Sequence, residues 1–114
     1  MSSTDAGPVS LPVIIVEQGR SVPMPGGNLP IESVLLHLDK QSRARSLVVR
    51  FPAGFTRDAI GHYVAAEDFL VLDGAIELVG ERFSAGDWGW VPPNATRWGF
   101  ASPEGALVYA WFSQ

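Results

Sequence analysis

The chain has 114 residues, which suits one domain of ordinary size and leaves no room for two. Hydrophobic residues make up 46% and charged residues 18%, a balance that predicts a packed core and argues against a disordered protein. The net charge of −4 argues against a nucleic-acid binder and against docking on anionic membranes, and the absence of cysteine excludes disulfides, zinc–thiolate sites and thiol catalysis.

The start of the chain is polar and contains glycine and proline. Residues 1–10 therefore predict a flexible tail rather than a secretory signal, which would need a basic start and an apolar stretch. No apolar stretch approaches the length of a membrane span. We expect a cytoplasmic protein with one domain over residues 11–114.

The 12 glycines and 9 prolines divide the chain into short runs rich in β-branched, aromatic and aliphatic residues. These runs predict strands over residues 13–17, 33–38, 46–51, 68–72, 75–79, 88–91, 96–100 and 106–112. Residues 23–30 contain three prolines and predict a loop, and residues 39–45 have room for a helical turn at most. The pairs Asp73-Gly74 and Gly80-Glu81 predict hairpin turns. Many short strands between turns are typical of a sandwich or a barrel.

One spacing of polar residues stands out in residues 54–74. Gly54 is followed by five residues and then by Ile60-Gly61-His62, four residues lead to Glu67, and six more lead to Gly74. The segment resembles the first motif of the cupin family, in which His-x-His stands where this chain has Ile60 and His62. Residues 60 and 62 would share one face of a strand, and Glu67 would return from the next strand.

A second segment, residues 86–101, resembles the second cupin motif. Gly86 and Pro92 keep the spacing of that motif, whereas Asn94 stands at a glycine position, Arg97 at the histidine position and Ala101 at the asparagine position. The residue pattern of segments 46–54 and 67–74 resembles that of the small single-domain ChrR-like cupins of the anti-sigma-factor type.

The resemblance implies an all-β fold, the RmlC-like jelly-roll barrel or double-stranded β-helix. In intact members it also implies iron, manganese, nickel or zinc held by three imidazoles and one carboxylate. Ile60 and Arg97 replace two of the imidazoles, so the metal site is degenerate. Arg97 cannot ligate a metal because its guanidinium stays protonated, but it would pair well with Glu67. We therefore predict no metal; the alternative ligand set is His62, Glu67 and His37.

These residues support three functions. The first is a metal-independent isomerase, cyclase, dehydratase or lyase, in which His62 or Glu67 is the base and Arg97 holds a carboxylate or stabilises an enolate. The second is a non-catalytic ligand-binding or sensor module, and the third is a metal-dependent, dioxygenase-like enzyme. Arg97 and Glu67 also have a purely structural interpretation as a buried ion pair.

Further residues are assigned by alternation and by position. Arg50 faces solvent by default but would add a second cation if it faced the cavity, so it joins Trp88 and Tyr109 as a ligand-binding candidate. Arg57 and Asp58, in the loop before the first motif's histidine position, are expected to be solvated. We expect a small organic ligand, acidic or aromatic, and a homodimer, because four tryptophans are many for so small a surface.

Overall fold

The computed structural model describes residues 19–114; the predicted tail of residues 1–10 and the predicted strand 13–17 lie outside this part. The elements in it are all β-strands: β1 (Arg20–Val22), β2 (Ile31–Leu38), β3 (Arg45–Phe51), β4 (Phe55–Arg57), β5 (Glu67–Leu78), β6 (Glu81–Ser84), β7 (Trp88–Val91), β8 (Phe100–Ser102) and β9 (Ala106–Phe112). Among these residues, no helix is long and apolar enough to cross a membrane.

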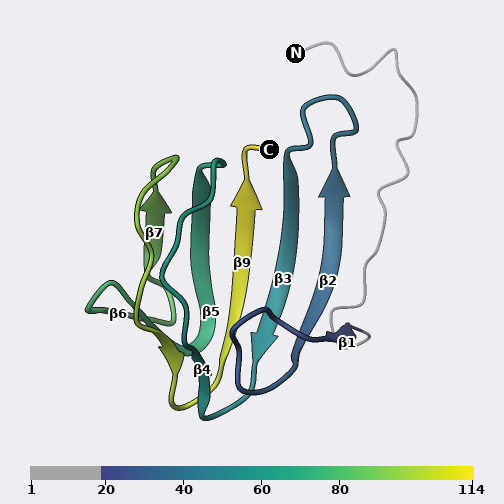
Figure 1. Ribbon diagram of the computed structural model, residues 1–114. Helices are drawn as coiled ribbons and strands as arrows, with labels where there is room; N and C mark the ends of the chain where they lie inside the picture. Colours follow the sequence, from purple (N-terminus) through teal and green to yellow (C-terminus); the bar gives the residue numbers. More distant parts are fainter. Residues whose placement is uncertain (1–18) are drawn as a thin grey trace.

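The strands form one curled antiparallel sheet in the order β1-β2-β3-β9-β5-β8-β4, and β6 and β7 both pair with β5. Strand β9 follows every other strand in the chain, yet it lies between β3 and β5 in the middle of the sheet (Figure 1). Such an order requires long connections between neighbouring strands, as in a jelly roll. The prediction of an all-β jelly roll is confirmed.

Strand β5 bends near its middle, and this bend curls the sheet. Its first half pairs with β7 and β9, and its second half pairs with β6, with a register shift between Val71 and Asp73. The predicted hairpin at Asp73-Gly74 is therefore wrong, because the two runs are one bent strand. Gly74 has φ +72°, and a Cβ there would clash with the carbonyl oxygen of Gly105. The same left-handed conformation serves a bulge as well as a turn.

Three other local predictions meet different outcomes. The turn expected at Gly80-Glu81 is centred one residue earlier, at Val79-Gly80, with positive φ at both positions. Of the strand expected over 96–100, only Phe100 belongs to a strand. In residues 39–45 one turn closes through a hydrogen bond from the Arg43 N–H to the Asp39 carbonyl (2.8 Å).

The core lies on the inner face of the curled sheet. Alternation sends Leu47, Val49 and Phe51 of β3 inward, and Val108, Ala110 and Phe112 of β9 do the same. The rings of Phe51, Phe55 and Phe100 pack together at one end, with centroids 4.9–5.9 Å apart. The inner face is thus apolar almost throughout, so the few polar side chains on it need partners.

Candidate functional site

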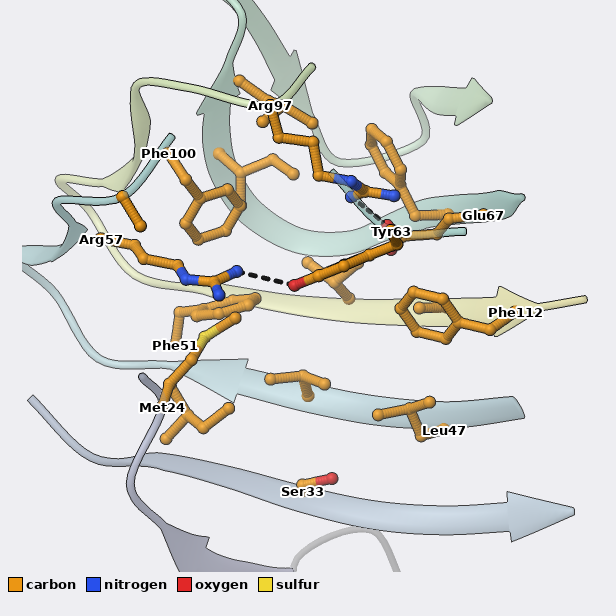
Figure 2. Close-up of a pocket in the computed structure, with 18 of the residues that line it drawn as sticks. Met24, Ser33, Leu47, Phe51, Arg57, Tyr63, Glu67, Arg97, Phe100 and Phe112 are labelled. Carbon is orange, nitrogen blue, oxygen red and sulfur yellow. Dashed lines mark hydrogen bonds and ion pairs between the residues drawn. The ribbon is translucent and has the colours of Figure 1, made fainter. Parts of the chain in front are cut away.

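A cavity of about 210 Å³ lies inside the curled sheet (Figure 2). Five lining residues carry polar side chains: Ser33, Arg57, Tyr63, Glu67 and Arg97. The rest of the lining is apolar or aromatic: Val22, Met24, Ile31, Leu47, Val49, Phe51, Ala59, Phe69, Ile76, Leu78, Trp98, Phe100, Val108, Ala110 and Phe112. An apolar pocket with a few convergent polar groups is the usual form of a small-molecule site.

An ion pair joins Arg97 and Glu67. Nη1 of Arg97 donates to Oε1 of Glu67 at 2.5 Å, and the two side chains are 13% and 12% exposed. Glu67 opens β5, whereas Arg97 comes from the loop before β8. That loop is fixed by two backbone hydrogen bonds between Gly61 and Arg97, of 2.7 and 3.2 Å. Residues far apart in the sequence therefore meet in the cavity wall.

Burial raises the pKa of the Glu67 carboxyl above its usual value of 4.5. The charge of Arg97 and its hydrogen bond oppose this effect, because both favour the ionised carboxylate. Arg97 engages Oε1, and no hydrogen bond to Oε2 is found among residues 19–114. Glu67 is thus a carboxyl group with a raised pKa and one oxygen that a ligand can reach, which is a common arrangement for a catalytic base.

Tyr63 lies between two guanidinium groups. Nη1 of Arg57 donates to the Tyr63 hydroxyl oxygen at 2.6 Å, and the Arg97 guanidinium carbon lies 4.2 Å from the centroid of the Tyr63 ring. Figure 2 shows Arg57 at the hydroxyl end of Tyr63, with Arg97 and Glu67 beside the ring. Because the hydroxyl oxygen already accepts from a cation, its own proton is directed elsewhere and can be donated to a ligand oxygen.

Arg97 keeps two donors without partners. Its Nε and Nη2 are buried and have no hydrogen-bond partner in the described part of the chain. A buried donor left unpaired costs about 1–3 kcal/mol. An acceptor in the cavity next to this guanidinium would offset that cost, once a small shift of the side chain brought the two together.

Comparisons with known proteins identify the fold. No protein-family model matches the sequence, and no curated protein matches it. An RmlC-like cupin from Shewanella frigidimarina NCIMB 400 matches with a TM-score of 0.67 and 22% identity, over 91% of this chain and 91% of that one. The protein has the cupin fold. The matching prediction from the two motifs is confirmed at the level of the fold.

Two further solved structures share this cupin fold. An acetylacetone dioxygenase from Acinetobacter johnsonii has a TM-score of 0.77 and 18% identity, over 93% of this chain and 75% of that one. The polyketide cyclase RemF from Streptomyces resistomycificus has a TM-score of 0.72 and 15% identity, over 90% of this chain and 79% of that one. Identities this low do not separate subgroups, so the ChrR-like assignment stays a prediction.

The cupin motif placed two residues, Ile60 and His62, incorrectly. His62 and Ile60 were expected to face the cavity, but His62 is exposed and Ile60 is 81% exposed. Residues 61–65 are not in a regular strand, and Tyr63 is the side chain that lines the cavity. A shift of one position in an extended segment exchanges its two faces, so His62 does not meet Glu67 and Arg97.

The other ligand-binding candidates also lie outside the cavity. Arg50 is exposed and pairs with Glu32 (3.8 Å) on the surface, and His37 is exposed on β2. Trp88 is 60% exposed, and Tyr109 alternates with the inward residues Val108 and Ala110, so neither lines the cavity. Arg50, Trp88 and Tyr109 face outward because inner and outer residues alternate along β3, β7 and β9. His37 faces outward because a register shift between Leu35 and His37 breaks the alternation of β2 and pairs His37 with Ser46.

Sequence reasoning missed Arg57 and Tyr63 as cavity residues. Arg57 was expected to be solvated, yet its Nε donates to the Pro25 carbonyl (2.8 Å) and its Nη1 reaches Tyr63. The available signal was alternation: Phe55 and Arg57 share one face of β4, and Phe55 is fully buried. A buried neighbour at i−2 is a reason to place Arg57 on the inner face.

The residues of this cavity do not fit a metal held by imidazoles and a carboxylate. Between residues 19 and 114, no group of three or more His, Cys, Asp or Glu side chains is arranged to hold a metal ion. Glu67 is the one carboxylate of the cavity lining, and the guanidinium of Arg97 is bonded to it. A divalent cation beside Glu67 would be repelled by that guanidinium.

Proposed function

We propose that the protein is a metal-independent enzyme that moves a proton on a carbon next to a carbonyl group, inside the cupin cavity. The observation that carries this proposal is Glu67, a carboxyl group with a raised pKa in an apolar cavity beside a cationic hydrogen-bond donor. A base is most effective when its pKa approaches the working pH, and burial moves Glu67 in that direction.

The proposed chemistry uses residues from one end of the cavity. The ionised Glu67 removes a proton from the carbon next to the carbonyl, and the electron pair moves onto the carbonyl oxygen as an enolate. Arg97 and the hydroxyl of Tyr63 donate hydrogen bonds to that oxygen. The Glu67 carboxyl exchanges its proton with solvent, and its return to the same carbon as the enolate reverts to the ketone gives isotope exchange. Return of a proton to another carbon conjugated with the enolate gives isomerisation.

The comparisons are compatible with carbonyl substrates. One protein of the same fold is named for acetylacetone, a diketone, and another is named for the cyclisation of polyketides. Both names belong to those proteins. They support a search for substrates among small ketones.

The first test is deuterium exchange at the carbon next to a ketone. Wild-type protein treated with a chelator is incubated with acetophenone in D₂O, and loss of the methyl proton signal is followed by NMR. We expect catalysed exchange, and we expect E67Q to lower its rate by on the order of 10²–10⁴-fold, the usual contribution of a general base. The matched control is E104Q, since Glu104 also accepts from an arginine, Arg82, at 2.5 Å but on the surface.

The outcomes separate the proposed functions. An unchanged exchange rate in E67Q contradicts the proposal. Ligand binding without exchange in the wild type contradicts it too, and favours a binding or sensor module in which Arg97 and Glu67 form only a structural pair. Exchange that is lost in the chelator and restored by Fe(II), Ni(II), Mn(II) or Zn(II) contradicts the metal-free mechanism.

A further inference from the structure

The cavity contains more positive than negative charge. Two guanidinium groups, Arg57 and Arg97, line it together with one carboxylate, Glu67. Glu67 accepts from Arg97, whereas the two partners of Arg57 among the described residues are neutral oxygens, the Pro25 carbonyl and the Tyr63 hydroxyl. Within residues 19–114, therefore, the cation of Arg57 has no carboxylate partner. A partly buried cation with neutral partners attracts an anion.

The volume of the cavity limits the size of that anion. An apolar cavity of about 150 Å³ accommodates benzene, which has six non-hydrogen atoms. In proportion, about 210 Å³ holds roughly eight or nine non-hydrogen atoms. One ring with one small polar group fits this space, and two fused rings do not.

The apolar lining determines the chemical character of the ligand beyond its anionic group. Away from Arg57, Tyr63, Glu67 and Arg97, the walls are aliphatic and aromatic side chains such as Val49, Val108, Phe51 and Phe112, and Ser33 is the one further polar residue of the lining. A ligand with several hydroxyl groups would leave them unpaired there.

We propose that the cavity selects a small monocarboxylate with an apolar body of one ring or an equivalent branched chain, its carboxylate bound by Arg57. This inference rests on the proposed function in using the same cavity, and it makes the substrate class a small keto acid with a branched chain, because one ring and a carboxylate alone already fill the space. The carboxylate at Arg57 would leave the ketone for Arg97 and Glu67. Binding of the carboxylate does not require Glu67 to act as a base.

Three probes of graded charge and size test this inference by calorimetry near pH 7. Benzoate carries the carboxylate, benzamide is its neutral isostere, and 2-naphthoate adds a second ring. We expect benzoate to bind at least tenfold more tightly than either of the other two. Equal affinity for benzamide would overturn the anion preference, and equal affinity for 2-naphthoate would overturn the size limit. No binding of benzoate at millimolar concentration would overturn the whole inference.

Variants assign the anion to Arg57. R57Q should weaken benzoate binding at least tenfold, and R57K, which keeps the charge, should recover part of that loss. R50Q is the matched control, because Arg50 is exposed and lies outside the cavity lining. Unchanged benzoate affinity in a folded R57Q would contradict the assignment, and the comparison of benzoate with benzamide in the wild type needs no variant.

The failure of this inference is distinguishable from failure of the proposed function. E67Q should still bind benzoate while it loses exchange. If benzoate and benzamide bind alike but exchange of a neutral ketone depends on Glu67, the substrate class is wrong and the proton-transfer function stands. If benzoate binds more tightly than benzamide but E67Q exchanges like the wild type, the substrate class stands and the proton-transfer function is wrong.

Discussion

Glu67 couples the proposed site to the stability of the protein. Its pKa is raised above 4.5 in the folded state, chiefly by burial, so the folded protein holds this proton to higher pH than the unfolded chain. The stabilisation from Glu67 is therefore fully present below pH 4.5 and is lost as pH rises through the raised pKa. The charge of Arg97 limits this effect but does not reverse it.

This linkage predicts a pH-dependent difference between the wild type and E67Q. We expect the unfolding free energy of the wild type, minus that of E67Q, to fall as pH rises above 4.5. Urea unfolding at a series of pH values measures the unfolding free energies of both proteins, with E104Q as the surface control. A difference that instead rises with pH would show that Arg97 outweighs burial and holds the pKa of Glu67 below its usual value.

At the scale of residues, the sequence predicted the Glu67–Arg97 pair better than it predicted the residues around that pair. The spacing of the two motifs placed Glu67 and Arg97 on facing elements, and their opposite charges gave a reason for them to meet. The motif spacing did not predict which way the His62 side chain points, because the orientation of side chains in an irregular segment depends on where its backbone is anchored. Here the anchors are the Gly61–Arg97 bridge and the bond from the Asn94 N–H to the Tyr63 carbonyl, which come from distant sequence.

At the scale of elements, two glycines with similar backbones differ in what surrounds them. Gly54 has φ +82°, and a Cβ added there would meet nothing within 4 Å. A Cβ on Gly74, at φ +72°, would clash with the Gly105 carbonyl oxygen. The first position carries only the cost of a left-handed conformation. The second adds a steric clash at the bend of β5.

We expect G54A to lower the unfolding free energy by about 1–2 kcal/mol, the cost of the left-handed conformation for a residue with a Cβ. G74A should cost roughly a further 1–3 kcal/mol, because overpacking against backbone cannot relax freely. Thermal or urea unfolding of the two variants measures the difference directly. Equal losses would mean that the bend opens to accept a side chain and that β5 is not held by its contact with Gly105.

Prediction of the elements succeeded where alternation and regular pairing coincide. The runs 88–91 and 106–112 match β7 and β9 at both ends. The strand predicted over 96–100 was wrong because the aromatic residues at 98 and 100 alternate as they would in a strand, whereas the backbone of Arg97 forms only an isolated bridge. The Asp73-Gly74 pair signalled positive φ correctly, but the sequence does not distinguish a bulge within one strand from a turn between two.

At the scale of the whole molecule, the outer face of the sheet is more apolar than a solvated surface needs to be. The register places Trp88, Leu70 and Tyr109 in one row across β7, β5 and β9, and places Trp90 and Trp111 on either side of Asp68 in the next row. Trp88 and Trp90 are 60% and 53% exposed. Clustered exposed aromatic residues are typical of protein interfaces.

We propose that this outer face binds a second copy of the chain, as expected from the number of tryptophans. W88E should shift the protein from dimer to monomer in sedimentation velocity at micromolar concentration, because a charge would be buried at the interface. V64E is the control, since Val64 is 63% exposed but lies on the segment that carries Tyr63 and not on the outer face. A wild-type protein that sediments as a monomer would contradict the homodimer.

The central place of β9 has a consequence for how the chain is made. A ribosome completes residues 31–78, which contain β2, β3 and β5, well before it reaches Ala106–Phe112. Until then β3 and β5 each expose an unpaired edge, and exposed edges invite association between nascent chains. The sheet therefore closes only after nearly all of the described chain has emerged, so chaperone protection during translation should matter more for this protein than its small size suggests.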